Sequence, residues 1–171
     1  MIEITIGIIA IFLGAWIIYG VTSFAPWVPT RTHDLARIEK AIVWDNVRVF
    51  YDVGSGTGHV LRYFAHRHPH VQFIGVEISL LLYVLSHIRN LRYPNITTLY
   101  GDAYVRNYSA ADVVYVFGTQ HTVNHRVRRD IVSQVKSEAQ IVLYNFTFNN
   151  WPGTKHEFSE HGKTMFTIYQ K

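Results

Sequence analysis

The chain contains no cysteine among its 171 residues, so it has no disulfide, no thiolate zinc site and no cysteine nucleophile. Charged residues make up only 16% of the chain, a low share for an ordinary soluble protein. This deficit has a local cause, because no formal charge stands between Glu3 and Arg31. The net charge of +4 is mild, and we expect no nucleic-acid partner.

The uncharged stretch over residues 4–24 is almost wholly apolar. A bilayer core needs about 20 such residues in a helix, so we predict a transmembrane anchor over residues 1–24, with residues 4–24 in contact with the lipid bilayer. A cleavable signal peptide usually begins with positive charge, and a buried soluble helix usually has a polar face. Arg31 and Lys40 follow the span, which predicts a single-pass membrane protein with its C-terminal domain in the cytoplasm, or in the matrix if the protein is mitochondrial.

The remainder divides into a proline-stiffened connector over residues 25–31 and one domain over residues 32–171. Within this domain, helical spacing alternates with β-branched and aromatic runs. This alternation predicts βαβ units, a parallel sheet and helices on both faces. The predicted strands are residues 47–53, 71–77, 95–102, 111–117 and 139–146, and the predicted helices are residues 32–44, 58–68, 79–90 and 120–138.

The end of the chain breaks this rhythm. After Phe146 there is no room for another full helix before two short runs, residues 155–160 and 163–170, which His161 and Gly162 join as an antiparallel hairpin. The predicted fold class is therefore α/β, and a sheet of this kind resembles the Rossmann-like sheet of the class I methyltransferases. Its parallel strands are closed by a C-terminal antiparallel hairpin and preceded by one transmembrane helix.

The stretch "VFYDVGSGTGHV" places a glycine loop directly after the first strand. In open α/β sheets the ligand lies beyond the carboxyl ends of the strands, where the chain order reverses. A dinucleotide and a sulfonium nucleoside are the two candidates. The dinucleotide fingerprint is G-x-G-x-x-G, whereas Gly54, Gly56 and Gly58 are spaced two apart. The carboxylate of Asp52 would repel a pyrophosphate, but it would attract the ammonium of a methionine moiety.

Two further acidic side chains stand at strand ends. Glu77 ends the second strand and is placed to accept hydrogen bonds from ribose hydroxyls, while Gly101-Asp102 follows the third strand and offers an acceptor for an adenine amino group. Together these positions favour S-adenosyl-L-methionine as the cofactor. The predicted binding residues are Asp52, Gly54, Ser55, Gly56, Gly58, Glu77, Ile78, Gly101, Asp102 and Ala103.

The chain resembles the small seven-β-strand protein-lysine methyltransferases. These include the single-span mitochondrial enzymes that act on the ATP synthase c-subunit or the adenine nucleotide translocase, and their archaeal broad-specificity relatives. The resemblance runs through "PWVPT", "YDVGSGTG", "GVEIS", "NITTLYGD", "ADVVYVF" and "NFTFNNW". It implies lysine methylation of a protein substrate, and it adds Thr30 to the cofactor site through a segment that closes over cofactor and substrate. The chain departs from the family pattern at His59 and Asn145.

The methyl acceptor should meet residues from the loops after the fourth and fifth strands, which face the methyl group. The predicted catalytic residues are Tyr115, Asn145, Phe146 and Trp151, with Trp27, Phe117, Gln120 and His121 as further lining residues. For Tyr115 and Phe146, burial in the sheet core is an equally good interpretation. The signature of amino-directed nucleic-acid methyltransferases is absent after residue 117.

Histidines alternate in "HRHPH", residues 66–70, but no carboxylate or cysteine completes the set, and we predict no metal site. The basic run from Arg126 to Asp130 is most simply the solvated face of its helix. Two alternative functions stay open at this point: a methyltransferase that acts on a lipid or small amphiphile, and a catalytically silent membrane-bound binding module.

Overall fold

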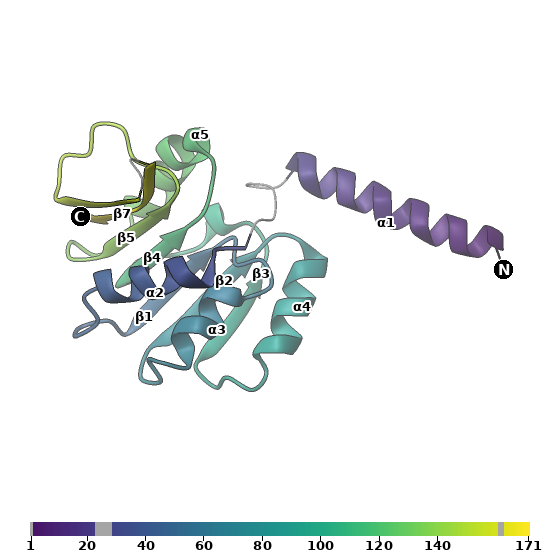
Figure 1. Cartoon of the computed structure of the whole chain (residues 1–171), viewed down its shortest axis with the longest axis horizontal. Helices are drawn as coiled ribbons and strands as arrows, with labels where there is room; N and C mark the ends of the chain where they lie inside the picture. The colour runs from purple at the N-terminus through teal and green to yellow at the C-terminus, as the bar shows by residue number, and fades with distance from the viewer. Residues whose placement is uncertain (1, 23–28, 161–162) are drawn as a thin grey trace.

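The computed structural model describes residues 2–22, 29–160 and 163–171. Its centre is a seven-stranded sheet with the order β3-β2-β1-β4-β5-β7-β6 (Figure 1). The first five strands are parallel, and β7 runs antiparallel to both β5 and β6. The predicted sheet and its closing hairpin are therefore confirmed. The strands are β1 (Val49–Val53), β2 (Gln72–Glu77), β3 (Ile96–Tyr100), β4 (Val113–Val116), β5 (Gln140–Tyr144), β6 (Lys155–Glu160) and β7 (Lys163–Gln170).

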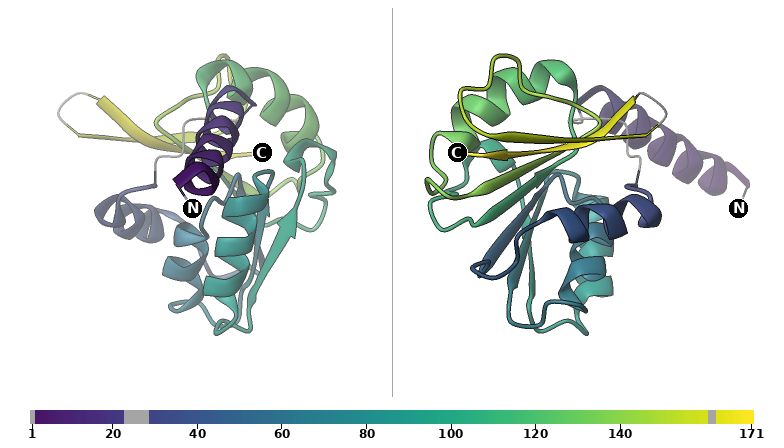
Figure 2. Two further views of the ribbon diagram at one scale, coloured as in Figure 1. Left: turned by 90° about the vertical axis from the view of Figure 1, so that its right-hand side faces the viewer. Right: turned by 60° about the vertical axis from the view of Figure 1, so that its left-hand side comes forward.

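Helices cover both faces of the sheet, as the alternating pattern predicts (Figures 1 and 2). One face carries α2 (Thr32–Ala41), α3 (His59–Ala65) and α4 (Leu80–Asn90). The other carries the short turn η1 (Ala103–Val105) and the consecutive helices α5 (Gln120–Thr122) and η2 (Val123–Val132). Strand residues alternate between these two layers because successive side chains of a strand point to opposite faces.

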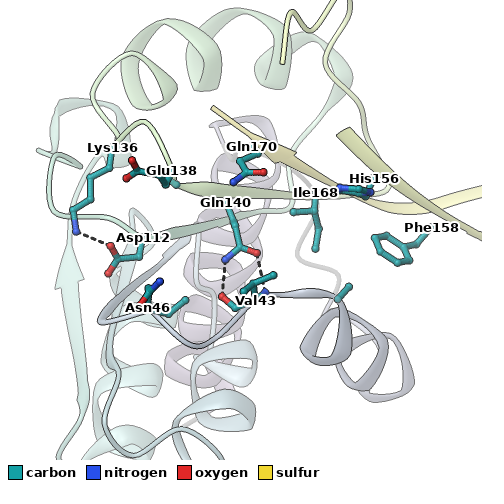
Figure 3. Close-up of a pocket in the computed structure, with 13 residues that line it drawn as sticks. Val43, Asn46, Asp112, Lys136, Glu138, Gln140, His156, Phe158, Ile168 and Gln170 are labelled. Carbon is teal, nitrogen blue, oxygen red and sulfur yellow. Dashed lines mark hydrogen bonds and ion pairs between the residues drawn. The ribbon is translucent and has the colours of Figure 1, made fainter. Parts of the chain in front are cut away.

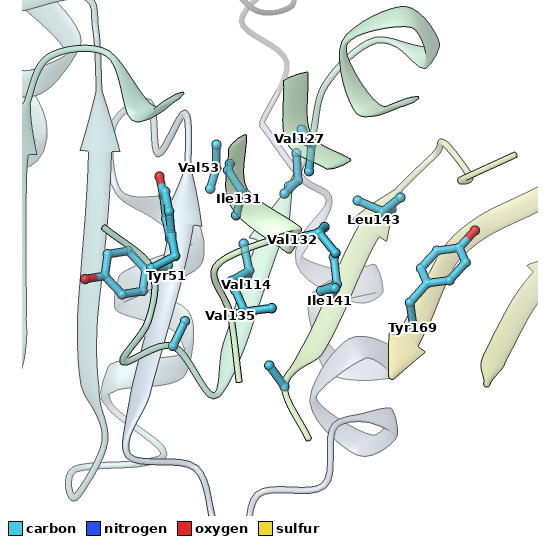
Figure 4. Packing of buried hydrophobic residues seen from close by; sticks show 14 of the residues in the cluster. Tyr51, Val53, Val114, Val127, Ile131, Val132, Val135, Ile141, Leu143 and Tyr169 are labelled. Carbon is cyan, nitrogen blue, oxygen red and sulfur yellow. The ribbon is translucent and has the colours of Figure 1, made fainter. Parts of the chain in front are cut away.

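Two apolar clusters hold the layers together. On the η2 side, Val127 and Ile131 pack over Val114 of β4 and Ile141 of β5 (Figure 4). On the opposite face, a second cluster joins the helices α2 and α3 to the sheet, with Leu35, Ile38, Leu61, Phe64, Phe50 and Phe73 among its fully buried members. Both clusters contain residues that strand or helix periodicity nominates as core.

The helix predicted over residues 120–138 differs from the observed one. It ends at Val132, and from Val123 onward it is a π-helix. Its buried residues Val123, Val127 and Ile131 recur every four positions, which is longer than the 3.6-residue turn of an α-helix. A helix bonded from i to i+5 has a wider turn and keeps such residues on one face.

The N-terminal segment forms the helix α1 (Ile2–Thr22), whose described side chains end at residue 15. Among the residues that the structure describes, no helix combines the length and the apolar character required to cross a membrane. The transmembrane part of the predicted fold class is thus not confirmed and stays a prediction. Trp27 and the turn at residues 161–162 lie outside the described residues.

Candidate active site

The carboxyl ends of the five parallel strands share one edge of the sheet, and the chain order reverses between β1 and β4. The glycine loop leaves β1 at this reversal. The amides of Gly54 and Ser55 both donate to the carbonyl of Val76, over 2.9 and 3.0 Å, and tie the loop to β2. This is the crevice in which open α/β sheets bind their ligands.

The spacing of the loop glycines follows from backbone conformation. Gly54, Gly56 and Gly58 have φ values of 77°, 54° and 73°, which residues with a Cβ rarely adopt. Space is also limited, since a Cβ on Gly58 would lie 2.6 Å from the hydroxyl of Ser86. The loop follows β1, and its conformation explains the three glycines; the predicted role of these glycines in cofactor binding stays a prediction.

Asp52 is almost completely buried, with 2% of its surface exposed, and its Oδ2 has no hydrogen-bond partner. Burial, followed by the nearby negative charge of Glu77, raises the pKa of the Asp52 carboxyl to about 8. A buried carboxyl group with an unpaired oxygen is costly unless a cation or donor completes it. The unpaired oxygen of Asp52 is therefore suited to a positively charged ligand group.

Glu77 is also buried, and its carboxylate accepts amide hydrogens from Gly56 over 2.7 Å and from Ser79 over 2.8 Å. Burial raises the pKa of Glu77, although these backbone amides oppose the shift. Each carboxylate oxygen retains a second lone pair that can accept a ligand hydroxyl. Glu77 therefore shapes the glycine loop in addition to its predicted role toward ribose, which stays a prediction.

Beyond β2 and β3 lies a cavity of about 290 Å³. Five of the predicted cofactor residues line it: Gly54, Ile78, Gly101, Asp102 and Ala103. Asp102 accepts the amide hydrogen of Tyr104 through Oδ1, over 2.9 Å, and its Oδ2 lies 3.3 Å from Nη2 of Arg126. These five residues, predicted from their positions at strand ends, thus lie together around one cavity.

The same cavity has lining residues that sequence reasoning missed, namely Val76, Tyr104, Thr119, Thr122 and Arg126. Thr119 follows β4 closely, and the strand-end rule would nominate it. Arg126 lies inside a helix, and its side chain is 46% exposed, as expected for a solvated face, but it also lines this cavity. Its guanidinium lies 3.7 Å from the centroid of the Tyr104 ring.

On the acceptor side, two tyrosines tie the N-terminal part of the domain to the sheet. Tyr115 on β4 is buried and shares a hydrogen bond of 2.6 Å with the hydroxyl of Thr30. Tyr144 on β5 donates to Asp34 of α2 over 2.7 Å, and burial, assisted by Asp34, raises its pKa to about 12. Thr30 is therefore held at the carboxyl edge, where the resemblance places it, while Tyr115 also belongs to the sheet core.

Asn145 follows β5 with a φ of 64° and an exposed side chain. Its backbone amide donates to the carbonyl of Met165 over 2.8 Å. Asparagine is one of the few residues that tolerates this conformation. Phe146 is half-buried and packs against the apolar cluster beside η2. Both lie after the fifth parallel strand, as predicted, and their catalytic roles stay predictions.

Trp151 does not join this group. Its indole stacks on Phe148 at 5.1 Å, and its Nε1 donates to the carbonyl of Gln170 over 3.3 Å. Gln170 pairs with Gln140 at the start of β5, on the edge opposite to the glycine loop. The tryptophan therefore closes the hairpin region instead of lining the acceptor site.

A larger cavity, of about 710 Å³, lies at that opposite edge (Figure 3). Three of its polar side chains are paired. Gln140 bonds both the amide and the carbonyl of Val43 over 2.9 Å, and Asp112 contacts Lys136 at 2.6 Å. This arrangement joins the α2–β1 connection to β5, and it contains none of the strand-end acids.

The histidine-rich turn also has structural partners. His68 stacks on Trp44 with ring centroids 3.7 Å apart and bonds to Glu39 over 3.2 Å. In the part of the chain that the structure describes, no group of three metal-ligating side chains gathers.

Known proteins with a similar sequence or structure are methyltransferases. A family model of the ANTKMT methyltransferase domain matches residues 52–155. An RNA methyltransferase from Salinibacter ruber, solved in complex with S-adenosyl-L-homocysteine, is 23% identical with a TM-score of 0.74 and covers 84% of this chain and 94% of its own. A search of curated proteins finds no match.

Two more distant structures share the fold. A precorrin-6y C5,15-methyltransferase from Geobacter metallireducens has 14% identity and a TM-score of 0.64, with 86% of this chain and 93% of its own covered. A SAM-dependent methyltransferase from Aquifex aeolicus has 14% identity and a TM-score of 0.61, with 80% and 88% covered.

Fold and site together define an S-adenosyl-L-methionine-dependent methyltransferase. More narrowly, the chain belongs to the family of the ANTKMT methyltransferase domain, whose model matches well over half of its length. The residues fit the cofactor, because S-adenosylmethionine carries positive charge and the buried Oδ2 of Asp52 lacks a partner. The predicted cofactor is confirmed, and membership in this family makes the chain an enzyme instead of a silent binding module.

Replacement of Asp52 should separate stability from cofactor binding. The raised pKa means that the folded protein holds a proton that the unfolded chain loses near pH 4, so this site destabilises the ligand-free fold progressively as the pH rises to about 8. We expect Asp52→Asn to raise the melting temperature of the ligand-free protein at pH 7 by about 10 °C. It should also abolish the stabilisation by S-adenosylhomocysteine. A variant that melts lower and still binds would contradict the assigned role.

Cofactor affinity should depend on pH with a defined sign. Because the cationic ligand prefers ionised Asp52, we expect affinity to rise between pH 5.5 and 7.5, by up to about tenfold per pH unit, with proton release on binding. Above about pH 8 the ligand loses its own ammonium proton and the trend should end. Calorimetry in buffers of different ionisation enthalpy measures both quantities. An affinity that falls between pH 5.5 and 7.5 would exclude a pairing of ionised Asp52 with the cationic ligand.

Proposed function

We propose that the protein transfers a methyl group from S-adenosylmethionine to the side-chain amine of lysine in a protein substrate. The match to the ANTKMT methyltransferase domain over residues 52–155 carries this proposal. The site is compatible with a cationic acceptor, because its described edge combines buried carboxyl groups with aromatic rings.

The cofactor supplies a methyl group bonded to a sulfonium, and the protein has to align and desolvate the amine that receives it. A lysine ammonium, with a reference pKa of about 10.4, first has to lose a proton. Burial in an apolar channel favours that loss. Phe117 packs edge-on against Tyr144, with centroids 4.9 Å apart, and Phe146 is half-buried nearby in sequence after β5. Such rings can border an aliphatic amine and interact with its charge.

Incubation of the full-length protein with labelled S-adenosylmethionine and a membrane extract tests the acceptor class. We expect labelled protein bands that contain methyl-lysine by mass spectrometry, and no label with Asp52→Asn. Label confined to lipid would replace the protein substrate with the lipid alternative.

Replacement of the acceptor-side aromatic ring should affect the substrate and not the cofactor. We expect Phe146→Ala to lower kcat/KM for the protein substrate by about tenfold, because a cation–π contact and channel wall are lost. The affinity for S-adenosylhomocysteine should stay within about twofold. Phe158→Ala is the matched control, since Phe158 lies on β6 with 36% of its surface exposed. Equal effects of the two variants on kcat/KM would count against a place for Phe146 in the wall of the substrate channel.

We also propose that α1 anchors the enzyme in a membrane, with the catalytic domain on the cytoplasmic side or on the matrix side of a mitochondrion. The support is the uncharged stretch over residues 4–24. In addition, its apolar side chains at Ile4, Ile11 and Leu13 are 69%, 71% and 58% exposed, so the protein itself provides little cover for them.

The absence of cysteine makes this anchor directly measurable. A polarity-sensitive fluorophore on Ile11→Cys should shift its emission to the blue in phospholipid vesicles and be quenched by spin-labelled lipids. The same fluorophore on Ser137→Cys, an exposed site after η2, should remain in water. Water-like emission at both positions would remove the anchor from the proposal and leave the methyltransferase assignment intact.

A further inference from the structure

Three arginines follow one another closely on η2, and they have different surroundings. Arg128 donates to the carbonyls of Asn149 and Asn150, and Arg129 pairs with its neighbour Asp130. Arg126 alone among these three lines the 290 Å³ cavity. A general need for surface charge does not explain this difference.

The position of Arg126 is fixed from three directions. Its Nη2 lies 3.3 Å from Oδ2 of Asp102, and its Nε lies 3.8 Å from Asp130. The guanidinium plane is held over the ring of Tyr104 at 3.7 Å. Thr122, the last residue of α5, lines the same cavity directly before η2 begins, and π-helices occur often at functional sites.

This arrangement contributes little to folding. The side chains of Arg126 and Asp102 are 46% and 36% exposed, and such surface pairs are weak because water and salt screen them. The result at the cavity wall is nevertheless specific. A carboxylate, which only accepts hydrogen bonds, stands beside a guanidinium, which only donates them.

An acceptor next to a donor matches one purine edge. On its N7 edge, adenine presents an amino group that donates beside a ring nitrogen that accepts, whereas a 6-oxo purine presents two acceptors on that edge. A carboxylate facing the 6-oxo group would be left without a donor, which is the type of mismatch that gives strong discrimination. Arg126 keeps the Asp102 carboxylate in place and adds the complementary donor.

We propose that Arg126 is a positioning residue that sets the preference of the cofactor cavity for a 6-amino purine, by holding Asp102 at the cavity wall. The inference concerns the cofactor and is independent of the acceptor, so a failure of lysine methylation would not affect it.

Calorimetry with two ligands tests this proposal without turnover. S-adenosylhomocysteine and S-inosylhomocysteine differ in the 6-amino and 6-oxo groups. We expect the native protein to prefer the adenosyl ligand by about tenfold or more. Arg126→Gln should reduce that ratio to about twofold, and Arg126→Lys, which keeps the charge but not the planar fork, should give an intermediate ratio. Arg129→Gln, the same substitution on the same helix away from the cavity, should leave the ratio unchanged.

The ratio separates a specific role from a structural one. A structural defect or a general loss of positive charge would weaken both ligands equally. An unchanged ratio in Arg126→Gln or Arg126→Lys, whatever the individual affinities, would overturn the proposal. Melting temperatures establish that each variant folds, and the milder lysine variant keeps the test decisive should the glutamine variant fail to fold.

Discussion

A buried carboxyl oxygen that has no hydrogen-bond partner and lies near a second acid is the constraint on which this site depends. Asp52 and Glu77 are both buried at the ends of neighbouring strands, and only Glu77 has its oxygens satisfied by backbone amides. Holding Asp52 protonated at pH 7 costs folding free energy on the order of 4 kcal/mol, because the unfolded chain would release that proton. Two apolar layers hold the rest of the fold together, and we propose that a cationic nucleoside offsets the cost at Asp52. At the end of β1, a lower stability of the ligand-free fold would thus accompany a higher affinity for the cofactor.

Most of the fold is predictable because its elements obey simple periodicities. The strands alternate with helices, and the last two runs are too close together for a crossover, so a hairpin is the remaining solution. The helix after β4 is the exception. Residues such as Val123 and Val127 recur every four positions, and sequence periodicity alone does not distinguish a drifting α-helix from the π-helix that forms. Tertiary packing against β4 and β5 decides between them.

The candidate site divides in the same way. Asp52, the loop glycines, Glu77 and Asp102 are predictable because parallel strands bring their carboxyl ends to one edge. Arg126 is not, since its place at the cavity depends on how η2 turns and on the ring of Tyr104 beneath it. The prediction that Trp151 lines the acceptor site fails because its place in the sequence is misleading. It follows β5 closely in sequence, but the chain has already turned back along the sheet, and its indole reaches the carbonyl of Gln170.

The hydrogen bond between Thr30 and Tyr115 limits how far the catalytic edge can stand from the end of α1. Eight peptide links separate Thr22 from Thr30. A fully extended chain covers about 3.5 Å per link, or about 28 Å in all. With α1 embedded in a bilayer, the length of the connector would set the largest distance between the lipid headgroups and the catalytic edge. Lysines near the lipid surface would fall within range, and those on distant domains of the same target would not.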